Sequence, residues 1–331
     1  MEENWLKDLP VSAENPAFKP EEMIVCAKCK RTNPPTRLAC FYCGAQLELS
    51  EEQSKNIKPH LRKMEIWEKG FNLILSPHGQ SFDEAKLSEI AKLLNLEREV
   101  LQKLLKAEKA MPLARIESEK EAEIIRERLR GLGVETFVLS DEALAVEKPQ
   151  KRLRGLDFSD EKIILILFNQ DEVAEIALED LCLIIKGAIF ERKTEATEKR
   201  SKKGENKIVQ SLETASDEFL IDIYSRKDAI GYRIFSKGFD FSCLGAEKEI
   251  LAKDNLKKLA QKLDEIAPDA KLIEDYMQIR ENLTSIWEAE ERTDSQGLKK
   301  GNFGRYNLGS LTTVNNSTQF TKYSRLQWHL L

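Results

Sequence analysis

The chain has 331 residues, of which 41% are hydrophobic and 33% are charged, and its formal net charge is -5. This length allows two or three domains with their own cores, and the small negative charge excludes a general attraction to nucleic acid or to anionic membranes. Residues 1–9 lack the pattern of a signal peptide, and no run approaches the ~18 apolar residues of a membrane span. We therefore expect a cytoplasmic protein.

An acidic, proline-containing segment at 1–22 predicts a flexible tail. A metal motif follows within 23–49, where four cysteines are spaced C-x2-C-x10-C-x2-C: Cys26, Cys29, Cys40 and Cys43. Two such pairs a short loop apart can arrange four thiolates tetrahedrally around one Zn²⁺. Four protein ligands leave no position for water, so we expect a structural ion that folds this short ribbon. Two disulfides or a redox C-x-x-C pair remain as alternatives.

Asn33 lies four residues after Cys29 and seven before Cys40. In this feature the ribbon resembles the Ran-binding-protein class of zinc finger, in which such an Asn stitches the ribbon together, and it equally resembles generic zinc ribbons. The resemblance implies a structural role for Asn33 and a binding role for the ribbon, since members of that class bind ubiquitin or single-stranded RNA.

RNA recognition needs cations for phosphates and planar groups for bases. The ribbon supplies both kinds of side chain: Arg31, Arg37, Phe41 and Tyr42. The alternative is that the two rings pack over the metal site while the arginines are solvated.

After a linker at 50–68, residues 69–142 predict one small α/β unit. Apolar runs and helical periodicity place strands at 71–75, 111–116 and 134–139, and helices at 81–94, 97–109 and 118–130, with Ser118 as an N-cap. The order β-α-α-β-α-β, together with the run SEKEAE at 118–123, resembles the C-terminal domain of the ribosomal stalk protein. In that family, basic residues of the first helix contact translational GTPases. The matching stretch at 83–89 is acidic, so we expect a packed small domain.

A second linker is predicted at 143–159, followed by a β-rich unit at 160–288. Strands are expected at 162–168, 181–191, 207–214, 219–224, 231–236 and 239–242, and helices at 247–266 and 272–286. Antiparallel strands closed by one helix resemble a pleckstrin-homology-like domain over 160–267. The whole chain is thus expected to be a multidomain α+β protein.

The stretch 192–207 carries seven basic and three acidic residues, a local charge of 7 − 3 = +4. Basic hairpins of pleckstrin-homology-like domains can hold anionic headgroups, and such a cluster also suits nucleic acid. Together with Arg37 of the ribbon, the candidate anion-binding residues are Lys199, Arg200, Lys202 and Lys203. A solvated hairpin tip is the alternative.

The last part, 289–331, predicts a polar linker followed by an apolar docking segment with three large rings: Phe320, Tyr323 and Trp328. This segment is expected either to dock on the protein's own surface or to bind a partner. Cys182 and Cys243 lie in apolar runs and are expected to be small core residues.

Catalytic motifs are missing from the sequence. The three histidines (His60, His78 and His329) have no triad or metal spacing, and no phosphate loop, dinucleotide fingerprint or nucleophile elbow is present. We therefore predict a non-enzymatic zinc-ribbon adaptor that binds another protein, without a small-molecule substrate. The alternatives are an RNA- or ribosome-associated factor that uses the ribbon and the basic loop, and a peripheral membrane protein.

Overall fold

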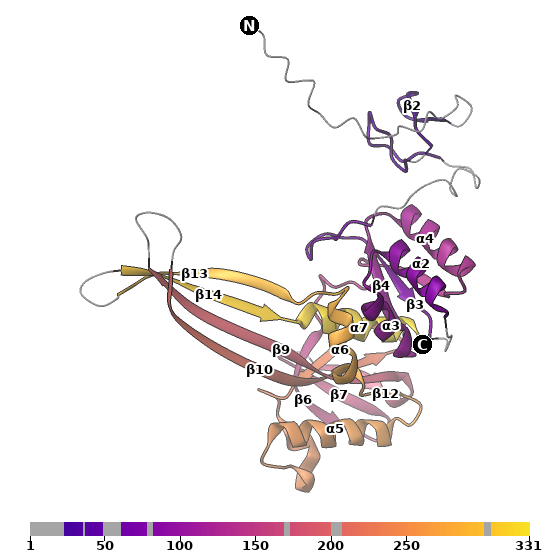
Figure 1. The fold of residues 1–331 in the computed structure, drawn as a ribbon. Helices are drawn as coiled ribbons and strands as arrows, with labels where there is room; N and C mark the ends of the chain where they lie inside the picture. Colours follow the sequence, from indigo (N-terminus) through magenta and orange to yellow (C-terminus); the bar gives the residue numbers. More distant parts are fainter. Residues whose placement is uncertain are drawn as a thin grey trace.

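The computed structural model describes residues 23–35, 37–48, 61–77, 82–168, 173–199, 207–300 and 306–331. The predicted acidic tail at 1–22, most of the first predicted linker, and the basic residues Arg200, Lys202 and Lys203 lie outside the described residues. The described part is a mixed α/β protein with a two-stranded, a three-stranded and a nine-stranded sheet (Figure 1). None of its helices is long and apolar enough to cross a membrane.

The small α/β unit has all six elements in the expected order. They are β3 (Phe71–Leu75), α2 (Glu84–Leu94), α3 (Arg98–Lys106), β4 (Met111–Ile116), α4 (Glu119–Gly131) and β5 (Thr136–Ser140). The strands form an antiparallel sheet in the order β4-β3-β5. As expected, the Ser118 side chain caps α4 by accepting a hydrogen bond from the backbone N–H of Glu121. The apolar faces of all three helices contribute to one core with the strands.

The large sheet has the strand order β13-β14-β9-β10-β11-β6-β7-β8, and β12 pairs with β9. Its strands are β6 (Lys151–Phe158), β7 (Lys162–Leu167), β8 (Val173–Ala177), β9 (Leu181–Lys199), β10 (Lys207–Ser225), β11 (Asp228–Phe235), β12 (Lys271–Ile273), β13 (Glu290–Lys300) and β14 (Tyr306–Asn315). Most pairs are antiparallel, but β6 with β11 and β12 with β9 are parallel. Within 160–267 the strand pairs are antiparallel, as expected, and the two parallel pairs are made by β6 and β12, segments outside that range that join the sheet beside the hairpins.

The base of β9 and β10 is buried on both faces, which explains the unbroken apolar run at 181–185. The apolar side chains on one face form a core with those of α5 (Ala252–Ile266). The same core includes buried side chains of β6, β7 and β8, from the other end of the sheet. The other face packs against α6 (Tyr276–Thr284), α7 (Ser317–His329) and the small α/β unit, with which it shares one continuous core. The α/β unit and the large sheet are thus joined by apolar packing.

Beyond this base, β9, β10, β13 and β14 extend away from the body as a four-stranded arm (Figure 1). β9 and β10 have 19 residues each, so each spans about 60 Å at ~3.3 Å per residue. The arm is a single layer: the described side chains from Gln210 to Ser216 are all exposed.

Four local predictions were wrong. The polar stretch expected as a linker at 289–316 forms β13 and β14, and the linker expected at 143–159 contains β6. The strands expected at 207–214 and 219–224 are one strand, β10, because on the arm the polar residues between them face solvent without interrupting the ladder. The strand expected at 239–242 is replaced by a 3-10 helix, η4 (Phe241–Glu247), whose N-terminus is capped by Asp240.

The apolar C-terminal segment forms α7, which lies inside the molecule. Phe320, Tyr323 and Leu326 are buried in the core shared by the α/β unit and the sheet. Arg325 is also buried and donates hydrogen bonds to the carbonyls of Leu144, Ala145 and Lys148. The structure therefore has this segment docked on its own chain, which was one of the two alternatives.

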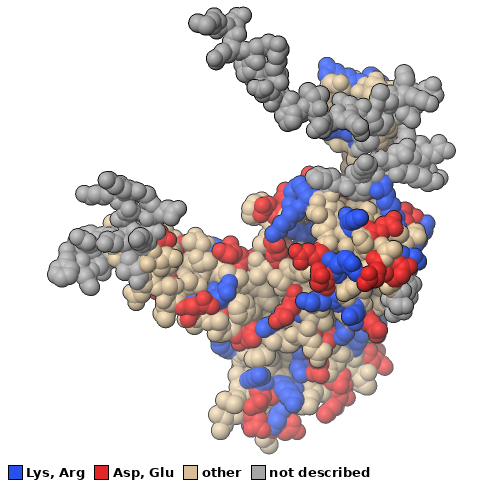
Figure 2. Space-filling model, in the orientation of Figure 1, with Lys and Arg blue, Asp and Glu red and all other residues tan. Residues whose placement is uncertain are grey.

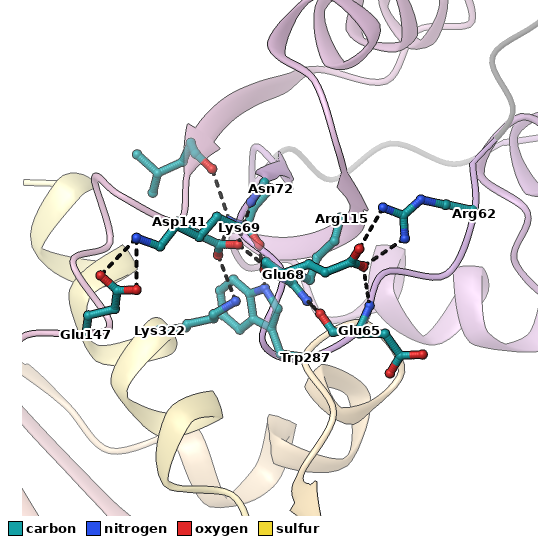
Figure 3. A network of polar contacts seen from close by, with 12 residues as sticks. Arg62, Glu65, Glu68, Lys69, Asn72, Arg115, Asp141, Glu147, Trp287 and Lys322 are labelled. Carbon is teal, nitrogen blue, oxygen red and sulfur yellow. Dashed lines mark hydrogen bonds and ion pairs between the residues drawn. The ribbon is translucent and has the colours of Figure 1, made fainter. Parts of the chain in front are cut away.

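A polar network joins α7 to the α/β unit (Figure 3). The Asp141 carboxylate accepts hydrogen bonds from Asn72 (3.0 Å), Arg115 (2.8 Å) and Lys322 (2.7 Å), and Trp287 donates its indole N–H to Asn72 (2.8 Å). Burial opposes ionisation of Asp141, but the charge of Lys322 and these hydrogen bonds outweigh it and hold the pKa of Asp141 below its ordinary value. Burial lowers the pKa of Lys322, which makes this lysine dependent on its carboxylate partner.

Candidate metal centre

The metal ribbon consists of two knuckles with the same backbone geometry. In the first, the N–H of Lys30 donates to the carbonyl of Cys26 (2.9 Å), and in the second, the N–H of Gly44 donates to that of Cys40 (2.9 Å). Lys30 and Gly44 both have positive φ, 59° and 69°. Each knuckle is closed by a further bond from the N–H of its first cysteine, to the carbonyls of Arg31 and Ala45 respectively. The repeated turn directs both cysteines of each pair toward the same centre.

The four sulfur atoms lie within 4.8 Å of one another. Two pairs are closer still: Cys26 to Cys43 at 3.6 Å and Cys29 to Cys40 at 3.5 Å. With Zn–S bonds of about 2.3 Å, the edge of a regular tetrahedron is about 3.8 Å. All four cysteines are free thiols, and the closest sulfurs come from different knuckles. The arrangement therefore fits a four-coordinate metal, as the spacing predicted.

The environment of the ribbon shifts the pKa values of three of its thiols in different directions. Backbone N–H groups, first that of Cys29, lower the pKa of Cys26. At Cys40 burial opposes ionisation, but N–H donors from the following turn and neighbouring side chains lower the pKa to about 6. At Cys29 the N–H of Arg31 lowers the pKa, but burial and the other thiols raise it to about 12. Four adjacent thiolates are thus not all stable without a positive ion among them.

Asn33 connects the two knuckles, as the sequence predicted. Its side-chain amide donates to the carbonyl of Arg31 (2.9 Å) and to the sulfur of Cys40 (3.5 Å), and its side-chain oxygen accepts from the N–H of Phe41 (2.8 Å). It is fully buried. The ribbon's apolar core is otherwise very small, comprising Ile24, Leu47 and two cysteines with few neighbours. This core is too small to fold alone, so the metal would supply most of the stability.

Phe41 and Tyr42 do not pack over the metal site. Phe41 is 67% exposed and Tyr42 is 53% exposed, and their rings meet edge to face with centroids 5.5 Å apart. The guanidinium of Arg31 lies 4.7 Å from the Tyr42 ring centroid, and that of Arg37 lies 4.9 Å from the Phe41 ring centroid. The ribbon therefore carries two exposed arginine–aromatic pairs. The alternative in which the two rings pack over the metal site does not hold.

The other predicted site residues are separated from the ribbon. The backbone of Lys199 lies at the far end of the arm, where it pairs with Lys207. Trp328 is half-buried and donates its indole N–H to the carbonyl of Ser225. Cys182 is buried and Cys243 half-buried in the two main cores, and burial raises the pKa of both thiols, as suits core residues.

A hollow of about 670 Å³ opens beside the polar network of Figure 3. Its wall carries acids and bases that already pair with one another, including Lys69 with Glu147 and Arg115 with Asp141. No motif in the sequence predicts this network. The signal present was a pair of basic residues, Lys322 and Arg325, three positions apart among the large apolar residues of the C-terminal segment.

Comparisons of the chain with protein-family models, with curated proteins and with solved structures gave no match.

Proposed function

We propose that the ribbon holds one structural Zn²⁺ and that this rigid module binds single-stranded nucleic acid, with RNA as the first candidate. The observation that carries the proposal is the pair of exposed arginine–aromatic contacts, Arg31 with Tyr42 and Arg37 with Phe41. The proposed activity is binding. The metal, enclosed by four sulfur ligands, has a structural role and no catalytic one.

The physical chemistry of these pairs suits an unpaired base. A base can stack on an aromatic ring or on a guanidinium plane, and the cation can also contact a phosphate. The two rings are perpendicular, so they present two differently oriented stacking surfaces on one turn of the ribbon. Bases within a duplex are already stacked on their neighbours, which favours a single strand as the ligand.

The end of the arm brings together the backbones of several basic residues. Strand pairing places Lys199 and Lys207 opposite each other, and Lys299 and Lys300 end β13, which β14 separates from β9. With four strands about 4.8 Å apart, these positions fall within roughly 15 Å. In the sequence, Arg200, Lys202 and Lys203 follow directly after Lys199. This group of basic residues supports the proposal as an auxiliary phosphate contact.

Fluorescence anisotropy of the zinc-loaded full chain with a labelled single-stranded RNA of random sequence tests the proposal. Alanine at Phe41 or Tyr42 should weaken binding by at least about fivefold, since stacking of one base is worth ~1–3 kcal/mol. Arg37→Glu should weaken it and also reduce its salt dependence. Lys28→Ala, at an exposed ribbon position that belongs to neither arginine–aromatic pair, is the control and should bind nearly like wild type. Equal binding by all variants, or no binding by wild type, would reject the proposal.

A protein-binding adaptor is the second candidate, and the exposed four-stranded arm favours it, because an open sheet edge is a common docking site for another strand. The third, a peripheral membrane protein, depends on the basic loop and on the resemblance to pleckstrin-homology-like domains. Sedimentation with phosphatidylserine-rich vesicles at low salt tests this alternative. Protein that stays in the supernatant would reject it.

A further inference from the structure

The two outer edges of the arm differ sharply in their protection against pairing. β13 forms one edge, and six of its eleven residues are charged, with a bulge at Gly297 (φ 69°). Charges and bulges are the devices by which sheet edges avoid joining other strands. The distal half of β10 forms the opposite edge. Between residues 210 and 216 it has a single charge, Glu213, and neither proline nor glycine.

The β10 edge is also open. On the side away from β9, β11 pairs with β10 only from Leu220 onward, so among the described residues no strand pairs with the outer side of β10 between 208 and 218. Two large apolar side chains stand on this stretch, Ile208 at 65% and Leu212 at 61% exposed. Figure 2 shows that charged side chains are sparse over the arm on the face in view, in contrast to the body. From Gln210 to Ser216, past a register irregularity between Ile208 and Gln210, this open edge carries a single charge and is a surface for β-pairing.

We infer that this edge pairs with the same edge of a second copy of the chain, antiparallel and about a two-fold axis at Leu212. In this register Leu212 lies opposite its own counterpart, Gln210 opposite Thr214, and Ser211 opposite Glu213 of the second copy. The single charge of the stretch therefore faces a hydroxyl side chain. The Lys207 end of one strand comes beside Asp217 and Glu218 of the other, where one base of the same chain, Arg280, pairs with Asp217 (2.7 Å). The net charges of these two ends are therefore opposite.

Charge complementarity and closure favour a second copy over an unrelated strand. A two-fold axis one residue further along the chain, at Glu213, would oppose the two Glu213 side chains, which is unfavourable. The two-fold arrangement pairs the open β10 edges of both copies with each other. The charged β13 strands then form the two outer edges of the joined arms. It also joins the two arms into one eight-stranded layer, with the two bodies at opposite ends. The inference does not depend on the proposed nucleic-acid binding.

Light scattering on a size-exclusion column tests the inference on the zinc-loaded full chain. At about 100 μM, wild type should elute with twice the mass of one 38.0 kDa chain and dissociate on dilution. Leu212→Lys adds a charge to the open edge and should shift the dimer to monomer by at least about tenfold in dissociation constant. Ser295→Lys adds the same charge to the exposed β13 edge and should leave the dimer intact. Circular dichroism checks that both variants keep their fold.

The register is tested by cross-linking. Opposed Cβ atoms across a strand pair lie about 4.5–5.5 Å apart, close to the range that a disulfide needs. Mild oxidation of Leu212→Cys should therefore give a reducible covalent dimer, whereas Ser295→Cys should give none above the wild-type background. A monomeric wild type at about 100 μM, or a dimer that Leu212→Lys and Ser295→Lys leave equally intact, would overturn the inference. Cross-linking of Ser295→Cys but not Leu212→Cys would overturn it as well.

Discussion

The contact between Phe320 of α7 and Gly187 of β9 gives a quantitative test of how the C-terminal helix docks. Phe320 is fully buried, lies 4.7 Å from the Tyr276 ring centroid and is covered by the guanidinium of Arg233. A Cβ at Gly187 would overlap this ring, at 2.8 Å from Cδ2 and 2.9 Å from Cζ. Glycine is therefore needed at 187 because of Phe320, and the two positions should be energetically coupled.

The magnitudes follow from this geometry. Phe320→Ala should lower the free energy of unfolding by about 3–5 kcal/mol, the usual loss for a buried ring. Gly187→Ala should lower it by about 1–3 kcal/mol, since the added methyl group overpacks the site. In the double variant the methyl group occupies space that the ring has left. The second substitution should then have little further effect, and the coupling energy should be at least about 1 kcal/mol.

Urea unfolding, followed by tryptophan fluorescence, measures all four proteins of the cycle. If Phe320→Ala unfolds the chain, Phe320→Leu provides a milder version with the same sign. Losses that add to within about 0.5 kcal/mol would show that the two residues do not touch. Full stability of Phe320→Ala would contradict docking on the same chain and return the segment to its alternative role as a partner-binding element.

Three further outcomes are expected. Cys40→Ser should abolish stoichiometric zinc in metal analysis, whereas Cys243→Ser should retain it; zinc kept by Cys40→Ser would contradict the four-sulfur site. Asp141→Asn should cost about 3–5 kcal/mol of unfolding free energy, because Lys322 and Arg115 would lose their buried carboxylate, and a loss below about 0.5 kcal/mol would argue against the network. The pKa of Asp141 is lower in the folded protein, so its contribution is complete above about pH 4 and is lost as the pH falls through the folded value. The difference between wild type and Asp141→Asn should accordingly shrink in acid, and a difference that grows would refute this linkage.

Local patterns determined much of this protein from the sequence alone. The cysteine spacing placed four sulfur atoms around one centre, and Asn33 at its expected distance from them joins the knuckles, because a short ribbon leaves few geometries for so many constraints. The six elements of the α/β unit were also predicted in their order along the chain. Its helices each have one apolar and one polar face, and two of its strands are short runs buried on nearly every residue, so helical periodicity and apolar runs indicate these elements directly.

Long-range pairing decided the rest. β13 and β14 are polar because both faces of the arm meet solvent, so they have no apolar period and resemble a linker until β9 provides a ladder for them. The docking of α7 likewise depends on partners far away in the chain: Gly187, Asp141 and the carbonyls near Leu144. Sequence periodicity shows that a face must be buried or can stay in water. Only the tertiary structure shows which distant segment meets that face, because the partner is selected by shape and by paired charges across the fold.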